Sequence, residues 1–516
     1  MKLRLTILLL SHLLFGLAAT ADGVGQAAPT VRDTLPALQE HQYLWGDILW
    51  GKSKNPALMQ RRYRSSHSEI ALGINHSKSN RAAILQLGDG HTLGQVEASS
   101  YLHLNPRNTV WGEASYRTGT RRHIVWNSTA DYLLLYPHVM ADTLGGNLTN
   151  ERYTFTGGWA GRTGQRTTIG AEMRFRAEHE YRTYDPRPRS IVTDMTIQLG
   201  AAYDLRKYTA AANAGLRFYK QTNSVSFFRE AGVIPEYQMV GLGTDYKRFS
   251  GSNASAYYKA TGMVAGLDFR PSGETGLFLS ARYDFTPYKR ILPRYNALPL
   301  TTLYVQQIEA EGGWKQQKGR WGYSLTADVN HERRTGDEHI AGNSSGSEYR
   351  IVDILTMYHS SQTTYRINAA LTHTTRQDSW TAWVRGGYVN SASRYETPAR
   401  HMNWRKAFAE VQGQWMHRFK GGSLLACRVN AAACHNLDRD MLMPYASMDK
   451  ASTALMDHTY ASLTANYYTA GAEMRIDIPL PTQKRYALFA LAGGSYTQDN
   501  GSYHRYTTHA AVGLTF

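Results

Sequence analysis

The chain has 516 residues, a formal charge of +16 and a composition rich in glycine, tyrosine and tryptophan, with 45, 34 and 11 residues. Its two cysteines cannot build a disulfide framework or a zinc cluster, so both classes are excluded. The only long apolar run, residues 5–17, is shorter than the roughly 20 residues that a membrane-spanning helix needs. A helical membrane protein is therefore excluded, and the absence of any linker favours one large unit.

The first 21 residues have the layout of a cleaved signal peptide. A basic start at Lys2 and Arg4 precedes an apolar core over residues 5–17, and small residues stand at Ala19 and Ala21. Cleavage removes two cations and lowers the formal charge to +14. In an exported protein such a charge favours contact with anionic lipid or lipopolysaccharide rather than with nucleic acid, which we do not expect as a partner.

Residues 22–65 are expected to form a periplasmic N-terminal segment. Within it, residues 35–50 carry Leu35, Leu38, Leu44 and Trp45 at spacings that suit a short amphipathic helix. Such a helix would either plug the interior of the following domain or rest on its rim.

From residue 66 to residue 516, apolar and polar residues alternate with a period of two, which predicts strands. Many runs last 12 to 18 residues and end in aromatic side chains. These features are typical of transmembrane strands with aromatic girdles, whereas strands of soluble proteins are usually 5 or 6 residues long. Lipid cannot satisfy an open sheet edge, so the strands must close into an antiparallel barrel. Two runs predict these membrane-facing side chains: Leu277, Leu279, Tyr283, Phe285, Trp321, Tyr323 and Leu325.

The pattern predicts about 18 strands in an up-and-down meander, with 16 as the alternative. Short turns such as Asn105-Pro106 and Gly421-Gly422 alternate with long polar stretches near residues 118–149, 221–254, 335–362 and 436–457. This alternation is typical of outer-membrane barrels, with short turns in the periplasm and long loops outside. The predicted strands begin near residues 68, 92, 108, 150, 165, 189, 207, 255, 275, 300, 319, 363, 378, 402, 421, 457, 484 and 502.

The opposite face of the strands carries charges of both signs. One interpretation is a selectivity path for a charged solute, and the other is a ladder of paired charges that stiffens the wall. The candidate residues lining the lumen are Glu172, Arg174, Arg176, Glu178, Arg217, Arg282, Asp284, Glu309, Glu311, Asp328, Glu332 and Glu410.

The last strand alternates Ala510, Val512 and Leu514 and ends in Phe516. It resembles the terminal strand of Gram-negative outer-membrane barrels, a resemblance that implies recognition of Phe516 by the barrel assembly machinery. The stretch Asn55-Pro56-Ala57 is similar to one that opens the barrel in fatty-acid-transporter-like outer-membrane proteins, although Leu58 and Met59 depart from the full motif. Residues 133–146 and 153–160 resemble an outer-membrane barrel family known only as a domain of unknown function, which implies location and architecture but no activity.

Three functions remain open. The first is a non-enzymatic, porin-like role in transport or solute binding, and the second is an accessory barrel that binds a surface or periplasmic partner protein and conducts nothing. Neither needs a cofactor or metal, and none is expected. The third is a hydrolase in the loops, but no nucleophile motif anchors the candidate residues. These are His401, His435, His458, His504, Asp438, Asp440 and Asp457.

Overall fold

The computed structural model describes residues 34–50, 52–228, 236–251, 255–345, 348–444, 450–481 and 486–516. The predicted signal peptide lies outside these residues. Within the described part of the chain, none of the helices has both the length and the apolar character needed to cross a membrane.

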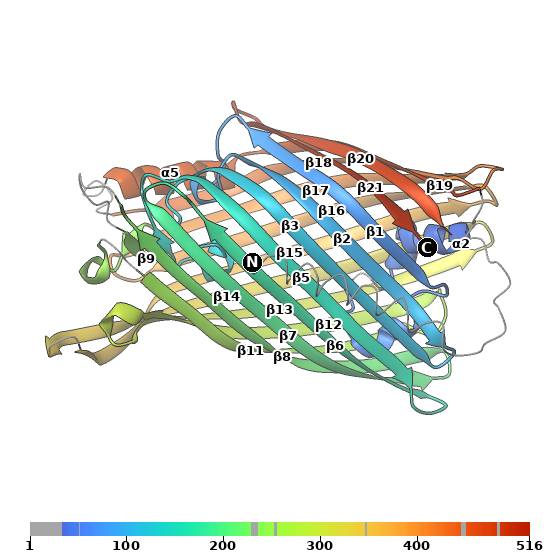
Figure 1. Ribbon diagram of the computed structural model, residues 1–516, viewed down its shortest axis with the longest axis horizontal. Coiled ribbons are helices and arrows are strands. Elements are labelled where there is room, and N and C mark those ends of the chain that lie inside the picture. Colours follow the sequence, from blue (N-terminus) through green and yellow to red (C-terminus); the bar gives the residue numbers. More distant parts are fainter. Residues whose placement is uncertain are drawn as a thin grey trace, which may run out of the picture.

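The protein is an all-β, closed barrel of 18 antiparallel strands (Figure 1). Each strand pairs with its neighbours in chain order, and the first strand pairs with the last from Glu69↔Thr515 to Ser79↔Arg505. The predicted fold and strand number are thus confirmed. The barrel strands are β1 (His67–Ser79), β2 (Gly90–Asn105), β3 (Asn108–Ile124), β5 (Gly146–Arg162), β6 (Thr167–Tyr181), β7 (Arg187–Leu205), β8 (Tyr208–Ser226), β11 (Ser255–Pro271), β12 (Gly276–Leu292), β13 (Leu298–Lys318), β14 (Trp321–Ser345), β15 (Glu348–Thr374), β16 (Asp378–Tyr395), β17 (Arg400–Arg418), β18 (Leu424–Leu442), β19 (Tyr467–Pro479), β20 (Ala487–Asp499) and β21 (His504–Thr515).

The two ends of the barrel differ. At one end, here called the turn end, short connections such as residues 106–107 and 206–207 join the strands. The other end, the loop end, carries the longer connections, including residues 125–145 and 227–254. In Figure 1 the turn end is on the right, with the C-terminus, and the loop end is on the left.

Two predicted strand starts are wrong, whereas the other sixteen lie within four residues of the observed starts. The strand expected near residue 363 begins at Glu348, because the polar stretch before it pairs with β14 in a long hairpin. The hairpin has three register shifts, which interrupt the alternation of apolar and polar residues. The strand expected near residue 457 is instead helix α5 (Lys450–Thr464), which buries Ser452, Leu455 and Met456 on one face.

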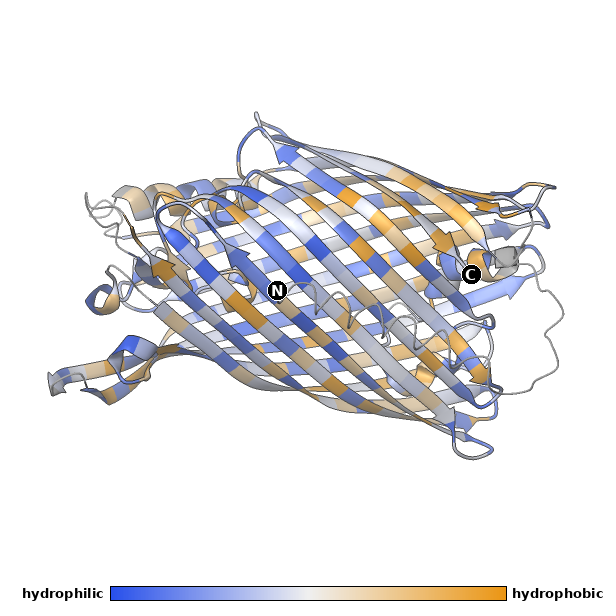
Figure 2. Ribbon diagram, in the orientation of Figure 1, coloured by the Kyte–Doolittle hydropathy of each residue, from blue (hydrophilic) through white to orange (hydrophobic). Residues whose placement is uncertain are grey.

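Hydrophobic and hydrophilic residues alternate along the barrel strands (Figure 2), and many large apolar side chains are exposed on the outside. Leu277, Leu279, Trp321, Tyr323 and Leu325 have 41–56% of their surface exposed on that face. Tyr283 and Phe285 alternate with the same residues and are partly exposed. Exposed apolar side chains over so large an area suit an environment of lipid rather than water.

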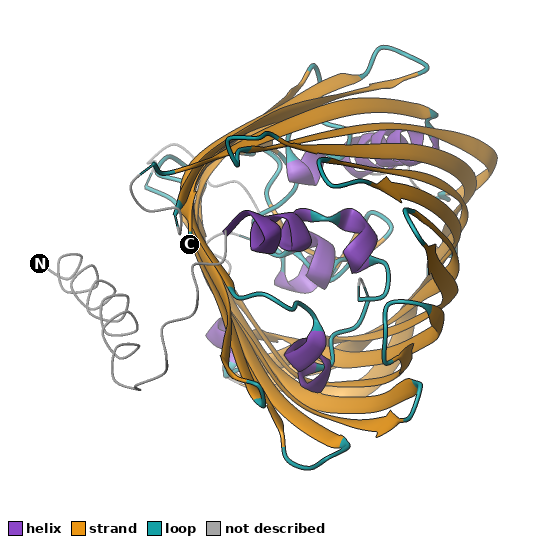
Figure 3. Cartoon of the chain, turned by 90° about the vertical axis from the view of Figure 1, so that its right-hand side faces the viewer, coloured by secondary structure: helices purple, strands orange, loops and turns teal. Residues whose placement is uncertain are grey.

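Two parts of the chain lie inside the barrel (Figure 3). At the turn end, the described part of the N-terminal segment (residues 34–50 and 52–65) contains α2 (Thr34–Gln42), α3 (Leu44–Asp47) and the 3₁₀-helix η2 (Pro56–Arg61). At the loop end, residues 125–145 and 236–251, here called the lid, contain α4 (Tyr132–Leu135), β4 (Met140–Ala141), β9 (Tyr237–Gly241), β10 (Thr244–Asp245) and η4 (Lys247–Phe249). The short strands β4, β9 and β10 form a separate three-stranded sheet. The remaining 3₁₀-helices are η3 (Leu85–Leu87) and η5 (Pro293–Tyr295).

Candidate functional site inside the barrel

The twelve charged residues proposed from the sequence occupy the strand faces opposite the exposed apolar side chains. Ten of them form ion pairs, for example Arg282 with Asp284 at 2.6 Å and Arg385 with Glu410 at 2.9 Å. Glu309 accepts a hydrogen bond from Gln307 at 3.2 Å, and Glu311 lies in the field of Lys52. The ten paired residues are Glu172, Arg174, Arg176, Glu178, Arg217, Arg282, Asp284, Asp328, Glu332 and Glu410.

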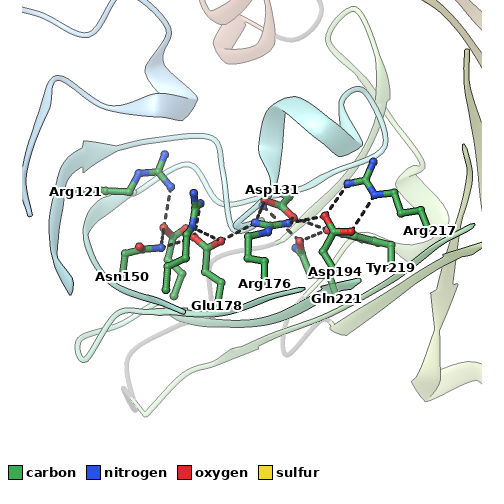
Figure 4. A network of polar contacts seen from close by, with 11 residues as sticks. Arg121, Asp131, Asn150, Arg176, Glu178, Asp194, Arg217, Tyr219 and Gln221 are labelled. Atoms are coloured by element: carbon green, nitrogen blue, oxygen red, sulfur yellow. Dashed lines mark hydrogen bonds and ion pairs between the residues drawn. The ribbon is translucent and has the colours of Figure 1, made fainter. Parts of the chain in front are cut away.

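The densest group of these charges crosses β3, β5, β6, β7 and β8 (Figure 4). Glu178 accepts hydrogen bonds from both Arg152 and Arg176, at 2.8 and 2.7 Å. Arg217 binds Asp194 through two nitrogens at 2.9 and 2.7 Å. Since each of these strands contributes at least one member, the network ties the inner faces of five strands together.

The N-terminal segment is held mainly by polar contacts with the wall. The hydroxyl of Tyr43 lies 2.6 Å from the Thr372 hydroxyl and 2.7 Å from that of Thr374. The ammonium of Lys315 donates to the carbonyl of Trp45 at 2.7 Å and lies 4.8 Å from its ring centroid. Further along, Lys52 pairs with Asp328 at 2.6 Å, so that the segment becomes part of the charge ladder.

The Asn55-Pro56 turn presses against the wall where two glycines leave room. A Cβ on Gly200 would lie 2.1 Å from the Asn55 side-chain oxygen, and one on Gly170 would lie 2.5 Å from the Pro56 carbonyl carbon. The same Asn55 oxygen accepts a hydrogen bond from the Ala57 amide at 3.0 Å and caps η2. These glycines therefore permit a close approach of two backbones.

The lid is folded into the loop end around an apolar core. Trp126, Tyr132, Leu135, Val139 and Met140 are at least 93% buried. They belong to one cluster with residues of nine wall strands and with Leu455 and Met456 of α5. This packing makes the lid a folded unit rather than a loose loop. The wall residues of the cluster include Val192, Tyr219, Tyr258, Tyr288, Leu303, Tyr358, Tyr395 and Met402.

Arginines of the wall satisfy the backbone of the lid. Arg290 donates to the carbonyls of Met239 and Val139, at 2.9 and 3.3 Å. Arg334 donates to the carbonyl of Tyr136 at 2.8 Å, and Arg400 to that of Leu242 at 2.9 Å. These bonds tie the backbone of the lid to the wall, and the Val139 carbonyl also accepts from the Met239 amide at 2.9 Å.

Asp131, just before α4, fixes the lid to the charge network. Arg176 donates to both oxygens of its carboxylate, at 2.8 and 2.5 Å, and the Tyr219 hydroxyl donates at 2.9 Å. Burial alone would raise the pKa of Asp131, but the guanidinium of Arg176 outweighs it and holds the pKa below its usual value. The lid is thus bound to β6 and β8 through an ionised carboxylate.

A second polar cluster lies between the lid and the β6–β7 connection and has two carboxylates for one arginine. Asp142 lies 3.5 Å from Arg182, and neither side chain has exposed surface. The Ser128 hydroxyl contacts Asp142 at 3.2 Å and Glu236 at 3.0 Å. Burial, reinforced by the Asp142 carboxylate, raises the pKa of Glu236 to about 8. Glu236 is therefore protonated at neutral pH, which leaves one cation and one anion in the cluster.

We expect Glu236→Gln to remove part of the pH dependence of stability. The folded protein holds this proton more tightly than the unfolded chain, whose ordinary value is 4.5. The stabilisation is complete below that value and declines as the pH rises toward 8. Glutamine stays neutral, so the melting temperature of the variant in detergent should fall less than that of the wild type between pH 5 and 9. Exposed Glu348→Gln is the control, and identical profiles for wild type and Glu236→Gln would contradict the assignment.

The candidate hydrolase residues are not brought together as one group. His401 lies 2.8 Å from Asp440, whereas Asp438 is 3.5 Å from Arg405 and His458 contacts the Ala82 carbonyl at 2.7 Å. His435 and His504 stand on β18 and β21, opposite Ala407 and Gln498 respectively.

At the C-terminus, the Phe516 amide donates to the Ser68 carbonyl at 2.9 Å and so extends the β1–β21 pairing.

No curated protein matches the chain. Similar solved structures include the ferric preacinetobactin receptor BauA from Acinetobacter baumannii (9% identity over 87% of this chain and 80% of that chain, TM-score 0.35). They also include the FrpB iron transporter from Neisseria meningitidis (6%, 87% and 81%, TM-score 0.38) and the siderophore receptor PiuA from Acinetobacter baumannii (5%, 87% and 82%, TM-score 0.37). Identities and TM-scores this low carry no argument about what the chain does.

The match to a family model confirms the resemblance of residues 133–146 and 153–160 to a family of unknown function. Similarity to fatty-acid-transporter-like proteins is not shown. The chain belongs to the family described as "Family of unknown function (DUF6850)", which matches residues 56–516.

Proposed function

We propose that the protein is an outer-membrane barrel that takes up or passes a polar solute through a lumen closed at rest. The observation that carries this proposal is the position of the charge ladder between the N-terminal segment at one end and the lid at the other. Charges of both signs along a lumen bind and release charged or strongly polar solutes. No cofactor and no catalytic step is part of this function.

In this proposal the turn end faces the periplasm and the loop end faces outward. Residues 1–21 are removed on export, residues 22–65 form the periplasmic N-terminal segment that acts as a plug, and residues 66–516 form the barrel. The assembly machinery reads Phe516, and lipid and lipopolysaccharide surround the wall. The twelve lumen charges contact the solute, and the seven membrane-facing residues contact acyl chains.

The N-terminal segment is the closure that moves. Its apolar contacts with the wall form two small clusters, one around Leu38 and Met416 and one around Leu58 and Ala202, and its other contacts include polar bonds that water can replace. The lid instead buries a continuous apolar core, and breaking it exposes far more apolar surface. Opening therefore begins at the turn end.

An accessory barrel that binds a partner protein and conducts nothing is the second candidate. The apolar core of the lid favours it, because a seal of this kind would keep the loop end shut even after the N-terminal segment has left.

Conductance in planar bilayers separates the two candidates. We expect the wild type to give no steady current and the protein lacking residues 22–54 to give single-channel currents, because the deletion removes α2, α3 and the Lys52–Asp328 pair. Heat-modifiable migration in gels verifies that both proteins are folded barrels. An absence of current in both would refute passage and support the accessory role.

A further inference from the structure

A shallow apolar groove runs across the outer face of β11–β15, toward the turn end. Its volume is about 850 Å³. Leu267 and Ile367 on its sides are 64% and 62% exposed, although their neighbours on the floor are small. The floor consists of Ala310, Gly312 and Ala327.

The strand register defines the shape of the groove. One row across the sheet joins Phe269, Leu279, Gly312, Ala327 and Ile367 as direct cross-strand neighbours. The next row lies two residues away along each strand, about 7 Å at 3.3 Å per residue. A helix with its side chains is about 10–12 Å wide, so the groove suits an extended acyl chain better than a helix.

The groove slopes through the apolar belt. Its first row lies two residues from the end of β11 at Phe269 but seven residues from the end of β15 at Ile367. Five residues along strands tilted by about 40° correspond to roughly 13 Å of depth. This is close to half of an apolar core of about 30 Å, so the groove crosses one leaflet.

Basic side chains lie at the end of the groove near Phe269, close to the turn end of the barrel. Arg206 and Lys207 form the β7–β8 turn and are exposed. The Lys207 carbonyl accepts a hydrogen bond from the Ser272 amide at 2.9 Å, which fixes this turn beside the end of β11. Tyr208 stacks on Phe269 at 4.7 Å and links the turn to the first row. Positive charge thus meets the groove at the depth of lipid headgroups.

We propose that this groove binds an anionic phospholipid, with the phosphate at Arg206 and Lys207 and one acyl chain lying along the row to Ile367. The site rests on the proposed membrane location but not on solute passage. It adds a specific lipid to a wall whose other apolar surface contacts lipid without selectivity.

Native mass spectrometry of the full-length protein, titrated with phosphatidylglycerol or phosphatidylcholine of equal chains, tests the charges. The wild type should retain one phosphatidylglycerol about 30-fold more strongly, because each Lys or Arg near an anionic headgroup contributes roughly a factor of five. Arg206→Gln with Lys207→Gln should abolish this preference. Lys318→Gln with Arg320→Gln, a basic turn away from the groove mouth, is the matched control and should retain it.

Filling the floor tests the acyl-chain part. Ala310→Leu with Ala327→Leu should weaken retention of both lipids, whereas Ala431→Leu with Ala433→Leu on the outer face of β18 should not. The proposal would be overturned if both alanine pairs lost lipid retention equally, or if the wild type showed no preference for phosphatidylglycerol. It would also be overturned if the groove bound no lipid, which would leave it for a protein segment. The same substitutions, made in the protein lacking residues 22–54, should leave its single-channel currents unchanged, so failure here is distinct from failure of the transport proposal.

Discussion

Replacing Gly200 with valine is expected to displace the Asn55–Leu58 turn from the wall and to convert a closed barrel into a conducting one. The first added carbon alone would lie 2.1 Å from the Asn55 oxygen, so the segment must move. Overpacking of this kind costs about 1–3 kcal/mol, which shifts the balance from docked to undocked segment by about 5- to 150-fold. Single-channel recording should show openings that are absent from the wild type.

A glycine two strands away from Gly200 supplies the control. Gly157, on β5, has no atom within 4 Å of an added Cβ, so Gly157→Val should behave as the wild type. Adding Asn55→Ala to Gly200→Val relieves the clash and should restore part of the closure, although the η2 cap is lost. A folded Gly200→Val barrel that stays silent would show that the N-terminal segment does not control access to the lumen.

The barrel can be predicted from the sequence because its strands share one pattern, in which apolar and polar residues alternate. Residues 275–285 and 321–332 already separate an apolar from a charged face, and the two environments on either side of a membrane barrel demand that separation. The short turns carry Gly, Pro, Asn and Asp, which mark where strands end. Local signals of this kind suffice for strand order because every strand pairs with its neighbours in sequence.

The interior was less predictable. The position of Asp131 beside Arg176 joins a loop to a strand 45 residues later, and no periodicity encodes such a contact. Helix α5 was missed since its 15 residues bury a face against the lid, a surface that the sequence does not reveal. Inward-facing Gly170 and Gly200 did offer a signal, because glycine within a strand often marks close approach of another backbone.

The paired charges need a different interpretation from a simple selectivity path. Arg282 and Asp284, or Arg385 and Glu410, satisfy one another across 2.6 and 2.9 Å. In the proposed transport function, a solute has to compete with these pairs, so the same residues would both stiffen the wall and set the cost of solute entry. The two interpretations of the charges are therefore compatible.

Arg176→Met should release the lid and destabilise the folded barrel by about 3–5 kcal/mol, the usual cost of removing one partner from a buried charge network. The change leaves the carboxylates of Asp131, Glu178 and Asp194 without their shared cation, which lies 2.5–3.4 Å from each. Chymotrypsin should then cut at Tyr132, which is 94% buried in the wild type. Arg174→Met, which removes only a partner of Glu172, is the matched control.

The pH dependence gives this prediction a second readout. In the wild type the pKa of Asp131 lies below its usual value, so its stabilisation is present at neutral pH and is lost as the pH falls through that lowered pKa. Without Arg176, burial dominates and the pKa rises, so ionised Asp131 destabilises the variant at neutral pH and acid should partly restore its melting temperature. Arg176→Lys keeps the charge and should retain the wild-type direction. A variant that melts like Arg174→Met at every pH would exclude Asp131–Arg176 as the contact that holds the lid.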